Sequence, residues 1–353
     1  MLDELSKASQ TLGLNLSTLE TAATSTEKDV AKFKSLVSEY WSGPPPQNEI
    51  KNVDLVLLGS IARQEVTGES DCDYVVLQNG CTPDMSQSLL LIAERVRTEL
   101  GYAPPGRQAV FGDIVIAGSL YERIGLESDT NQNLTHRMLL LTESISVFSQ
   151  LAHDEVIDNI LRRYCADYLP PRRETGHEAM VPRHFVNDLV RFWRTMAVDF
   201  GAKRWRSFKD DSHLRLIKLR TTRKILFAGP LCSLLLVPQR INTADELPQY
   251  LRQWLNKPPL AQLASLACDD NIKLSADSSK ALGQVLVAYD SLLGLFNERG
   301  TREALKNPDS VGKVFKEAND KCHEIAETIE SGLETIFFDD PIFKSTFRKY
   351  SVF

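Results

Sequence analysis

Residues 57–77 read LLGSIARQEVTGESDCDYVVL, and this stretch decides the fold of the segment around it. A hydrophobic run over 53–58 leads into the Gly59-Ser60 pair, and a second hydrophobic run covers 74–77. Short apolar runs bounded by turn residues are typical of buried strands. The sequence therefore predicts two strands joined by a polar loop.

Two carboxylates stand just before the second predicted strand, at Asp71 and Asp73. Side chains two residues apart on an extended chain point to the same side, so both carboxylates are expected to face together and Cys72 to pack on the opposite side. Oxygen ligands placed in this way suit Mg²⁺ bound to a triphosphate. The Gly59-Ser60 turn offers small residues and backbone N–H groups where phosphate oxygens must come close.

The pattern Gly-Ser, Ala-Arg-x-Glu and Ser-Asp-x-Asp, followed by a hydrophobic strand, resembles the signature of the DNA polymerase β-type nucleotidyltransferase superfamily. It is most similar to the branch that holds protein uridylyltransferases and minimal nucleotidyltransferases. The resemblance covers Asp54 to Ala117, and the matching residues are Gly59, Ser60, Arg63, Glu65, Ser70, Asp71 and Asp73.

The resemblance implies a third carboxylate on a later strand, and the matching position is Asp113 in the run QAVFGDIVIA. Asp71, Asp73 and Asp113 are then the catalytic carboxylates and the ligands of Mg²⁺ or Mn²⁺. By alternation Asp113 can instead face outward from a strand over 108–117, in which case Glu69 or Asp129 is the alternative ligand.

The nucleotide is expected to lie against the turn and the loop that follows it. The resemblance assigns the triphosphate to Gly59, Ser60 and Ser70. Arg63 either contacts a phosphate or braces the loop through Glu65, and the brace is favoured.

The chain of 353 residues has an ordinary globular composition, with 42% hydrophobic and 25% charged residues. Length and pattern predict an α+β protein: an N-terminal helical segment at 1–46, a small mixed-sheet nucleotidyltransferase core at 47–120, and an all-helical domain at 121–353. No convincing strand pattern follows residue 118.

No apolar run reaches the ~20 residues of a membrane span, and no signal peptide is expected. The six scattered cysteines suit a cytoplasmic protein.

Charge is unevenly distributed along the chain. The net charge is −6, yet residues 183–224 hold twelve Lys and Arg against four Asp and Glu. Such a segment often meets an anion. Lys218, Arg223 and Lys224 are predicted to bind the β- and γ-phosphates; the alternatives are an RNA backbone or a solvated face paired with nearby acids.

The resemblance, carried by these residues, implies a metal-dependent transferase that moves a nucleoside monophosphate from ATP or another nucleoside triphosphate to a hydroxyl acceptor, with release of pyrophosphate. An RNA end, such as that of tRNA, and a partner protein are the favoured acceptors. A toxin-like or antiphage role follows from family analogy only. The alternatives are a non-catalytic nucleotide-binding regulator of the same fold and a synthase of nucleotide second messengers.

Overall fold

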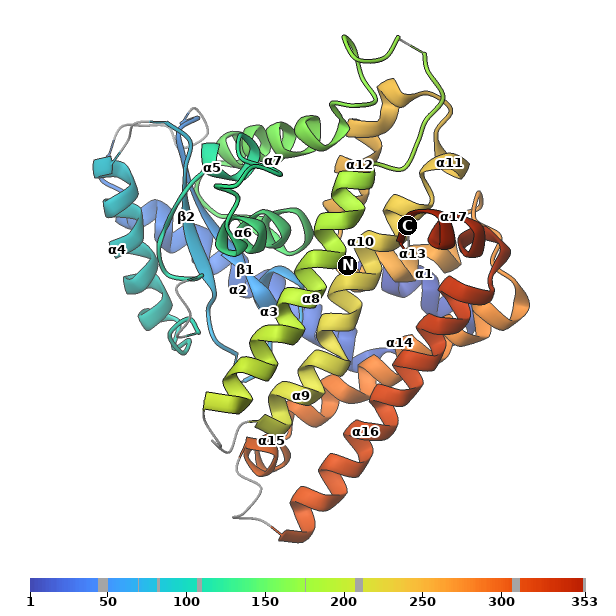
Figure 1. The fold of residues 1–353 in the computed structure, drawn as a ribbon. Helices are drawn as coiled ribbons and strands as arrows, with labels where there is room; N and C mark the ends of the chain where they lie inside the picture. The colour runs from blue at the N-terminus through green and yellow to red at the C-terminus, as the bar shows by residue number, and fades with distance from the viewer. Residues whose placement is uncertain are drawn as a thin grey trace. The chain divides into compact units, whose positions relative to one another are not determined.

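The computed structural model describes residues 1–43, 50–68, 70–80, 83–106, 110–174, 176–206, 212–306 and 312–351. It is a mixed α+β protein, mostly helical, with one small sheet (Figure 1). The chain divides into two compact units. We call Ala22–Pro182 with Ile241–Pro258 the sheet unit, and Met1–Thr21 with Arg183–Arg240 and Pro259–Phe353 the helical unit.

The sheet unit is built on four strands, β1 (Val53–Leu58), β2 (Tyr74–Gln78), β3 (Ile114–Ile116) and β4 (Ser144–Ser146), in the order β3-β2-β1-β4. β1 runs antiparallel to both β2 and β4, whereas β2 and β3 are parallel. Both strands predicted on either side of the polar loop are therefore present. Every residue of β1 is buried, which explains why it reads as a continuous apolar run.

Alternating residues of β1 and β2 form one core with α2 (Ser17–Tyr40) and α4 (Pro83–Glu99) (Figure 1). Leu55, Leu57 and Val76 pack there with Phe33 and Leu89. The remaining elements of the sheet unit are α3 (Gly59–Ala62), α5 (Gly118–Tyr121), α6 (Asn131–Thr142), α7 (Gln150–Cys165), η2 (Ala244–Glu246) and α12 (Leu247–Leu255).

Asp54 connects β1 to the start of α7. Its Oδ1 accepts hydrogen bonds from the N–H groups of Phe148 and Ser149, at 3.1 and 2.6 Å. The Ser149 hydroxyl in turn caps α7 by accepting from the Ala152 N–H. Asp54 is fully buried, and this burial raises its pKa to about 6.

Only helices occur in the described part of the helical unit. They are α1 (Leu2–Leu12), α8 (Arg183–Arg206), α9 (Ser212–Arg220), α10 (Thr222–Leu235), α11 (Val237–Arg240), α13 (Pro259–Cys268), α14 (Ala276–Asn297), α15 (Arg299–Lys306), α16 (Gly312–Glu334), η4 (Thr335–Asp339) and α17 (Pro341–Ser351). α1 packs against α13, and α14 packs against α16. Among the described residues, no helix has the length and apolar character needed to cross a membrane.

Two expectations from the sequence need correction. The segment 121–353 is not all-helical, because β4 forms at 144–146 by pairing with β1. The compact units also do not follow the predicted ranges 1–46, 47–120 and 121–353, since the chain enters each unit more than once. Such long-range packing leaves no mark in local composition.

Candidate functional site

The turn after β1 brings Gly59 against Asp73. Gly59 has a φ of +66°, and a Cβ built on it would lie 2.8 Å from Asp73 Oδ2. Glycine is therefore required here twice, for its backbone conformation and for the close approach of the carboxylate. The Leu58 N–H donates to the Asp73 carbonyl at 2.8 Å, which fixes the two segments side by side.

Asp71 and Asp73 lie close enough for the charge of Asp71 to act on Asp73. Both are half-buried, and burial together with the negative charge of Asp71 raises the pKa of Asp73 to about 7. The Gly106 N–H donates to Asp73 Oδ1 at 3.3 Å and partly offsets this shift. Cys72, between them, points into the core and is fully buried, which confirms its expected packing role.

Asp113 is not brought together with this pair. It is exposed, it lies one residue before β3, and its carboxylate accepts from the N–H of Ile114 at 2.7 Å. Of the predicted strand over 108–117, residues 108 and 109 lie outside the described residues, and β3 covers only Ile114–Ile116 of the rest, because Gly112 at φ +73° forms a turn before it. In the described portion of the chain, no three His, Cys, Asp or Glu side chains gather into a metal-binding group.

Glu69 and Asp129 are the alternatives to Asp113 as a third metal ligand. Glu69 lies outside the described residues. Asp129 is buried and forms a two-pronged ion pair with Arg137, at 3.1 and 2.9 Å. The Arg137 guanidinium also donates to the Tyr164 hydroxyl, so this cluster holds α6 and α7 together within the fold.

Arg63 braces the turn, and the expected contact with Glu65 is present at 2.8 Å. A second partner, Glu143, also receives a hydrogen bond from the Arg63 guanidinium. Both glutamates are buried. Arg63 lowers, and Glu143 raises, the pKa of Asp73, so both charges lie close enough to act on the candidate site. Sequence reasoning missed Glu143, because it follows Arg63 by eighty residues and belongs to no motif.

The remaining predicted nucleotide contacts are of two kinds. Ser60 is half-buried at the start of α3, and its carbonyl accepts from the Glu65 N–H at 2.9 Å. Ser70 is buried instead, and its hydroxyl accepts from the Thr67 N–H at 3.0 Å. Ser70 therefore holds the loop closed, and its hydroxyl is already engaged within that loop.

The predicted basic residues belong to the helical unit, whereas the carboxylate pair belongs to the sheet unit. Lys224 forms an ion pair with Glu330 at 2.7 Å, and this contact lowers the pKa of Glu330. Lys218 and Arg223 also have interaction partners. For Lys224 the structure therefore shows the alternative in which the lysine pairs with an acidic residue. Phosphate binding by Lys218 and Arg223 stays a prediction.

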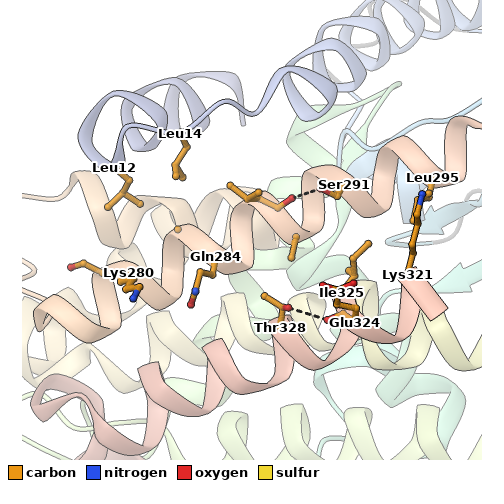
Figure 2. A pocket seen from close by; sticks show the side chains of 14 residues that line it. Leu12, Leu14, Lys280, Gln284, Ser291, Leu295, Lys321, Glu324, Ile325 and Thr328 are labelled. Atoms are coloured by element: carbon orange, nitrogen blue, oxygen red, sulfur yellow. Dashed lines mark hydrogen bonds between the residues drawn. The ribbon is translucent and has the colours of Figure 1, made fainter. Parts of the chain in front are cut away.

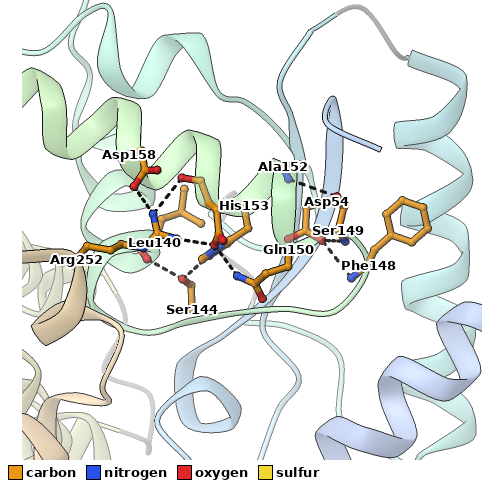
Figure 3. A network of polar contacts seen from close by, with 11 residues as sticks. Asp54, Leu140, Ser144, Phe148, Ser149, Gln150, Ala152, His153, Asp158 and Arg252 are labelled. Atoms are coloured by element: carbon orange, nitrogen blue, oxygen red, sulfur yellow. Dashed lines mark hydrogen bonds and ion pairs between the residues drawn. The ribbon is translucent and has the colours of Figure 1, made fainter. Parts of the chain in front are cut away.

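A second polar cluster in the sheet unit contains Ser144 and His153 (Figure 3), together with Asp154. The Ser144 hydroxyl lies 2.9 Å from His153 Nε2, and His153 Nδ1 lies 3.7 Å from Asp154. A serine nucleophile would donate its proton to the histidine. Here the hydroxyl donates to the Leu140 carbonyl at 2.6 Å instead. The Arg252 guanidinium also reaches Asp154, so the cluster ties α12 and β4 to α7.

The carboxylate pair fits a divalent cation by the chemistry of its donors. Burial and the negative charge of Asp71 raise the pKa of Asp73, and a bound cation would offset the repulsion between the two carboxylates. Mg²⁺ is commonly held in proteins by one or two carboxylates, with phosphate oxygens and water completing its shell. Comparison with known protein-family models and with curated proteins finds no match to this chain.

Proposed function

We propose that this chain is a metal-dependent nucleotidyltransferase, which moves a nucleoside monophosphate from a nucleoside triphosphate to a hydroxyl acceptor. The observation that carries the proposal is the contact between Gly59 and the Asp73 carboxylate, next to Asp71. This contact brings the backbone of Gly59 close to a carboxylate that has a second carboxylate nearby, and a triphosphate with its cation needs both backbone N–H groups and carboxylate ligands.

Asp71 and Asp73 would hold the divalent cation, Mg²⁺ or Mn²⁺. When bound, the cation would offset the charge of the triphosphate and of the departing pyrophosphate. Because no third carboxylate clusters with this pair among the described residues, substrate oxygens and water must supply the other ligands. Nucleotide and cation are therefore expected to bind together.

The turn would hold the phosphates through the Gly59 backbone and the Ser60 hydroxyl. Arg63 acts on the site through Glu65 and Glu143, so we regard it as a positioning residue. Its guanidinium links the turn after β1 to the residue before β4, and this fixes the turn that faces Asp73.

The reaction is an in-line displacement at the α-phosphorus. The acceptor hydroxyl oxygen forms the new P–O bond, the bond to the β-phosphate oxygen breaks, and the acceptor proton passes to water. Pyrophosphate leaves with the electron pair of the broken bond. Positioning of the two reactants would supply much of the acceleration. An RNA end and a protein hydroxyl are the proposed acceptors, favoured by the basic segment 183–224.

A non-catalytic nucleotide-binding regulator is the second candidate. The separation of Asp113 from the carboxylate pair favours it, because one cation held by two carboxylates can bind a triphosphate without activating an acceptor. Nucleotide binding without turnover would distinguish this candidate from the transferase.

The test supplies each α-³²P-labelled nucleoside triphosphate with Mg²⁺ or Mn²⁺, together with total RNA or cell protein. We expect label in one acceptor class and release of pyrophosphate. Asp71→Asn with Asp73→Asn should abolish both, while Asp84→Asn, an exposed change elsewhere in the sheet unit, should not. Full transfer by the double variant would refute the assignment; cation-dependent nucleotide binding without transfer to any acceptor would favour the regulator.

A further inference from the structure

A groove of about 870 Å³ lies on the helical unit, and none of its lining residues belongs to the carboxylate site (Figure 2). Its walls are α14 and α16, and the connection between α1 and α2 closes one side.

The floor of the groove is apolar and open to solvent. Leu12, Leu14 and Ile325 are only partly buried, and Val287 keeps 41% of its surface exposed. Gly283 also lines the groove, and a Cβ built on it would lie 3.6 Å from a Leu14 methyl group. A concave apolar surface of this kind is typical of a binding site, because leaving it in water is unfavourable.

The rim carries a lysine toward each end. Lys280 stands beside Leu12 and Gln284 at one end, and Lys321 stands beside Leu295 at the other (Figure 2). Leu295 follows Lys280 by fifteen positions along α14, which corresponds to roughly 22 Å at 1.5 Å per residue. In the part of the chain that the structure describes, neither lysine forms an ion pair or a hydrogen bond.

Length and charge together narrow the choice of occupant. An amphiphile with one anionic head group could meet only one of the two lysines. A helix of about fifteen residues matches the length of the groove and can carry an acidic residue near each end. Its apolar face would occupy the floor, which is the usual mode of helix recognition by a groove.

We propose that this groove binds an amphipathic helix of a partner protein, with acidic residues near both ends facing Lys280 and Lys321. Glu324 lies one helical turn from Lys321 on the same wall and forms no ion pair among the described residues. The bound helix is therefore expected to carry a basic or neutral residue facing Glu324, one turn inside the end that meets Lys321. This asymmetry gives the bound helix a defined direction.

The test is selection from a displayed library of 16-residue helical peptides. Leucine is kept at the i, i+3, i+4 and i+7 positions, and all other positions vary among Glu, Lys and Gln. We expect the full-length protein to enrich Glu at both ends. The double variant Lys280→Glu with Lys321→Glu should enrich Lys at both ends instead. It should also bind the peptides selected on the wild-type protein at least tenfold more weakly.

Two matched controls separate the groove from general surface effects. The double variant Lys273→Glu with Lys316→Glu makes the same change in net charge at exposed positions outside the groove, and it should select the same peptides as the wild-type protein. Val287→Glu should weaken binding at least tenfold, whereas Val314→Glu should not. Val314 is exposed to a similar extent, 45%, and lies outside the groove. Circular dichroism checks that each variant is folded.

Three kinds of result would overturn the proposal. The first is a set of selected peptides without Glu enrichment at the ends, or selected peptides whose affinity Val287→Glu leaves unchanged. The second is displacement of the selected peptides by palmitate at equal concentration, which would indicate a small amphiphile. The third is a protein dimer that Val287→Glu dissociates, which would make a second copy of this chain the occupant.

Discussion

Alanine at Gly59 tests the close approach between the turn and Asp73. The new Cβ would stand 2.8 Å from Asp73 Oδ2, and Gly59 has a φ of +66°, which an L-residue adopts at a cost of about 1–2 kcal/mol. The carboxylate cannot turn away freely, because its Oδ1 accepts from the Gly106 N–H. Displacing it adds the cost of overpacking, about 1–2 kcal/mol. The total loss of stability is therefore about 2–4 kcal/mol.

Gly101→Ala is the matched control within the sheet unit. Gly101 also has a positive φ, +75°, but no atom of the described residues lies within 4 Å of the position that its Cβ would take, so it should lose only about 1–2 kcal/mol. Hydrogen exchange of peptides from β1 and β2 gives the free energy of opening for each variant. The excess loss at Gly59 should speed exchange by roughly 5- to 30-fold relative to Gly101→Ala.

A double-mutant cycle isolates the contact itself. In an Asp73→Ala background the carboxylate is gone, so Gly59→Ala should cost only its backbone penalty. The coupling free energy between the two positions is then expected to be about 1–2 kcal/mol. Equal costs for Gly59→Ala in both backgrounds would refute the geometry on which the candidate site rests.

Three further predictions concern the sheet unit. Arg63→Ala should reduce the free energy of unfolding in urea by about 3 kcal/mol, because it leaves the buried carboxylates of Glu65 and Glu143 without their shared guanidinium; a loss below 1 kcal/mol, roughly that of a surface ion pair, would contradict the brace. The pKa of Asp54 is raised from 3.8 to about 6, so the folded state favours its protonated form, and stability is highest below pH 3.8 and falls as pH rises through 6. The shift in pKa corresponds to about 3 kcal/mol of stability, and about half of this is lost between pH 5 and 8. The difference in unfolding free energy between wild type and Asp54→Asn should therefore decrease by about 1.5 kcal/mol over that interval. A difference that does not change with pH would contradict the burial effect. Asp113→Asn should leave the Mn²⁺ affinity of the protein within twofold of wild type by calorimetry, because its carboxylate is exposed and bonded to its own strand; a tenfold loss would place Asp113 in the site.

The local pattern of the chain predicted the elements whose stabilisation is local. The apolar runs over 53–58 and 74–77 form β1 and β2, since buried strands need continuous apolar side chains. Period-two alternation also predicted correctly that Cys72, between the two aspartates, packs into the core. Both results follow from backbone geometry that extends over only a few residues.

Tertiary structure decided the features that depend on distant partners. β4 is a three-residue strand, Ser-Ile-Ser, which exists because β1 offers it hydrogen-bonding groups. Asp113 lies in an apolar run that reads as a strand, yet β3 begins only at Ile114, and the carboxylate of Asp113 stays exposed. The partner of Arg63 at Glu143 is likewise set by the fold, because a residue eighty positions away is brought near only when β4 pairs with β1. Sequence therefore determined the carboxylate pair and its turn, and the packing of distant segments determined what surrounds them.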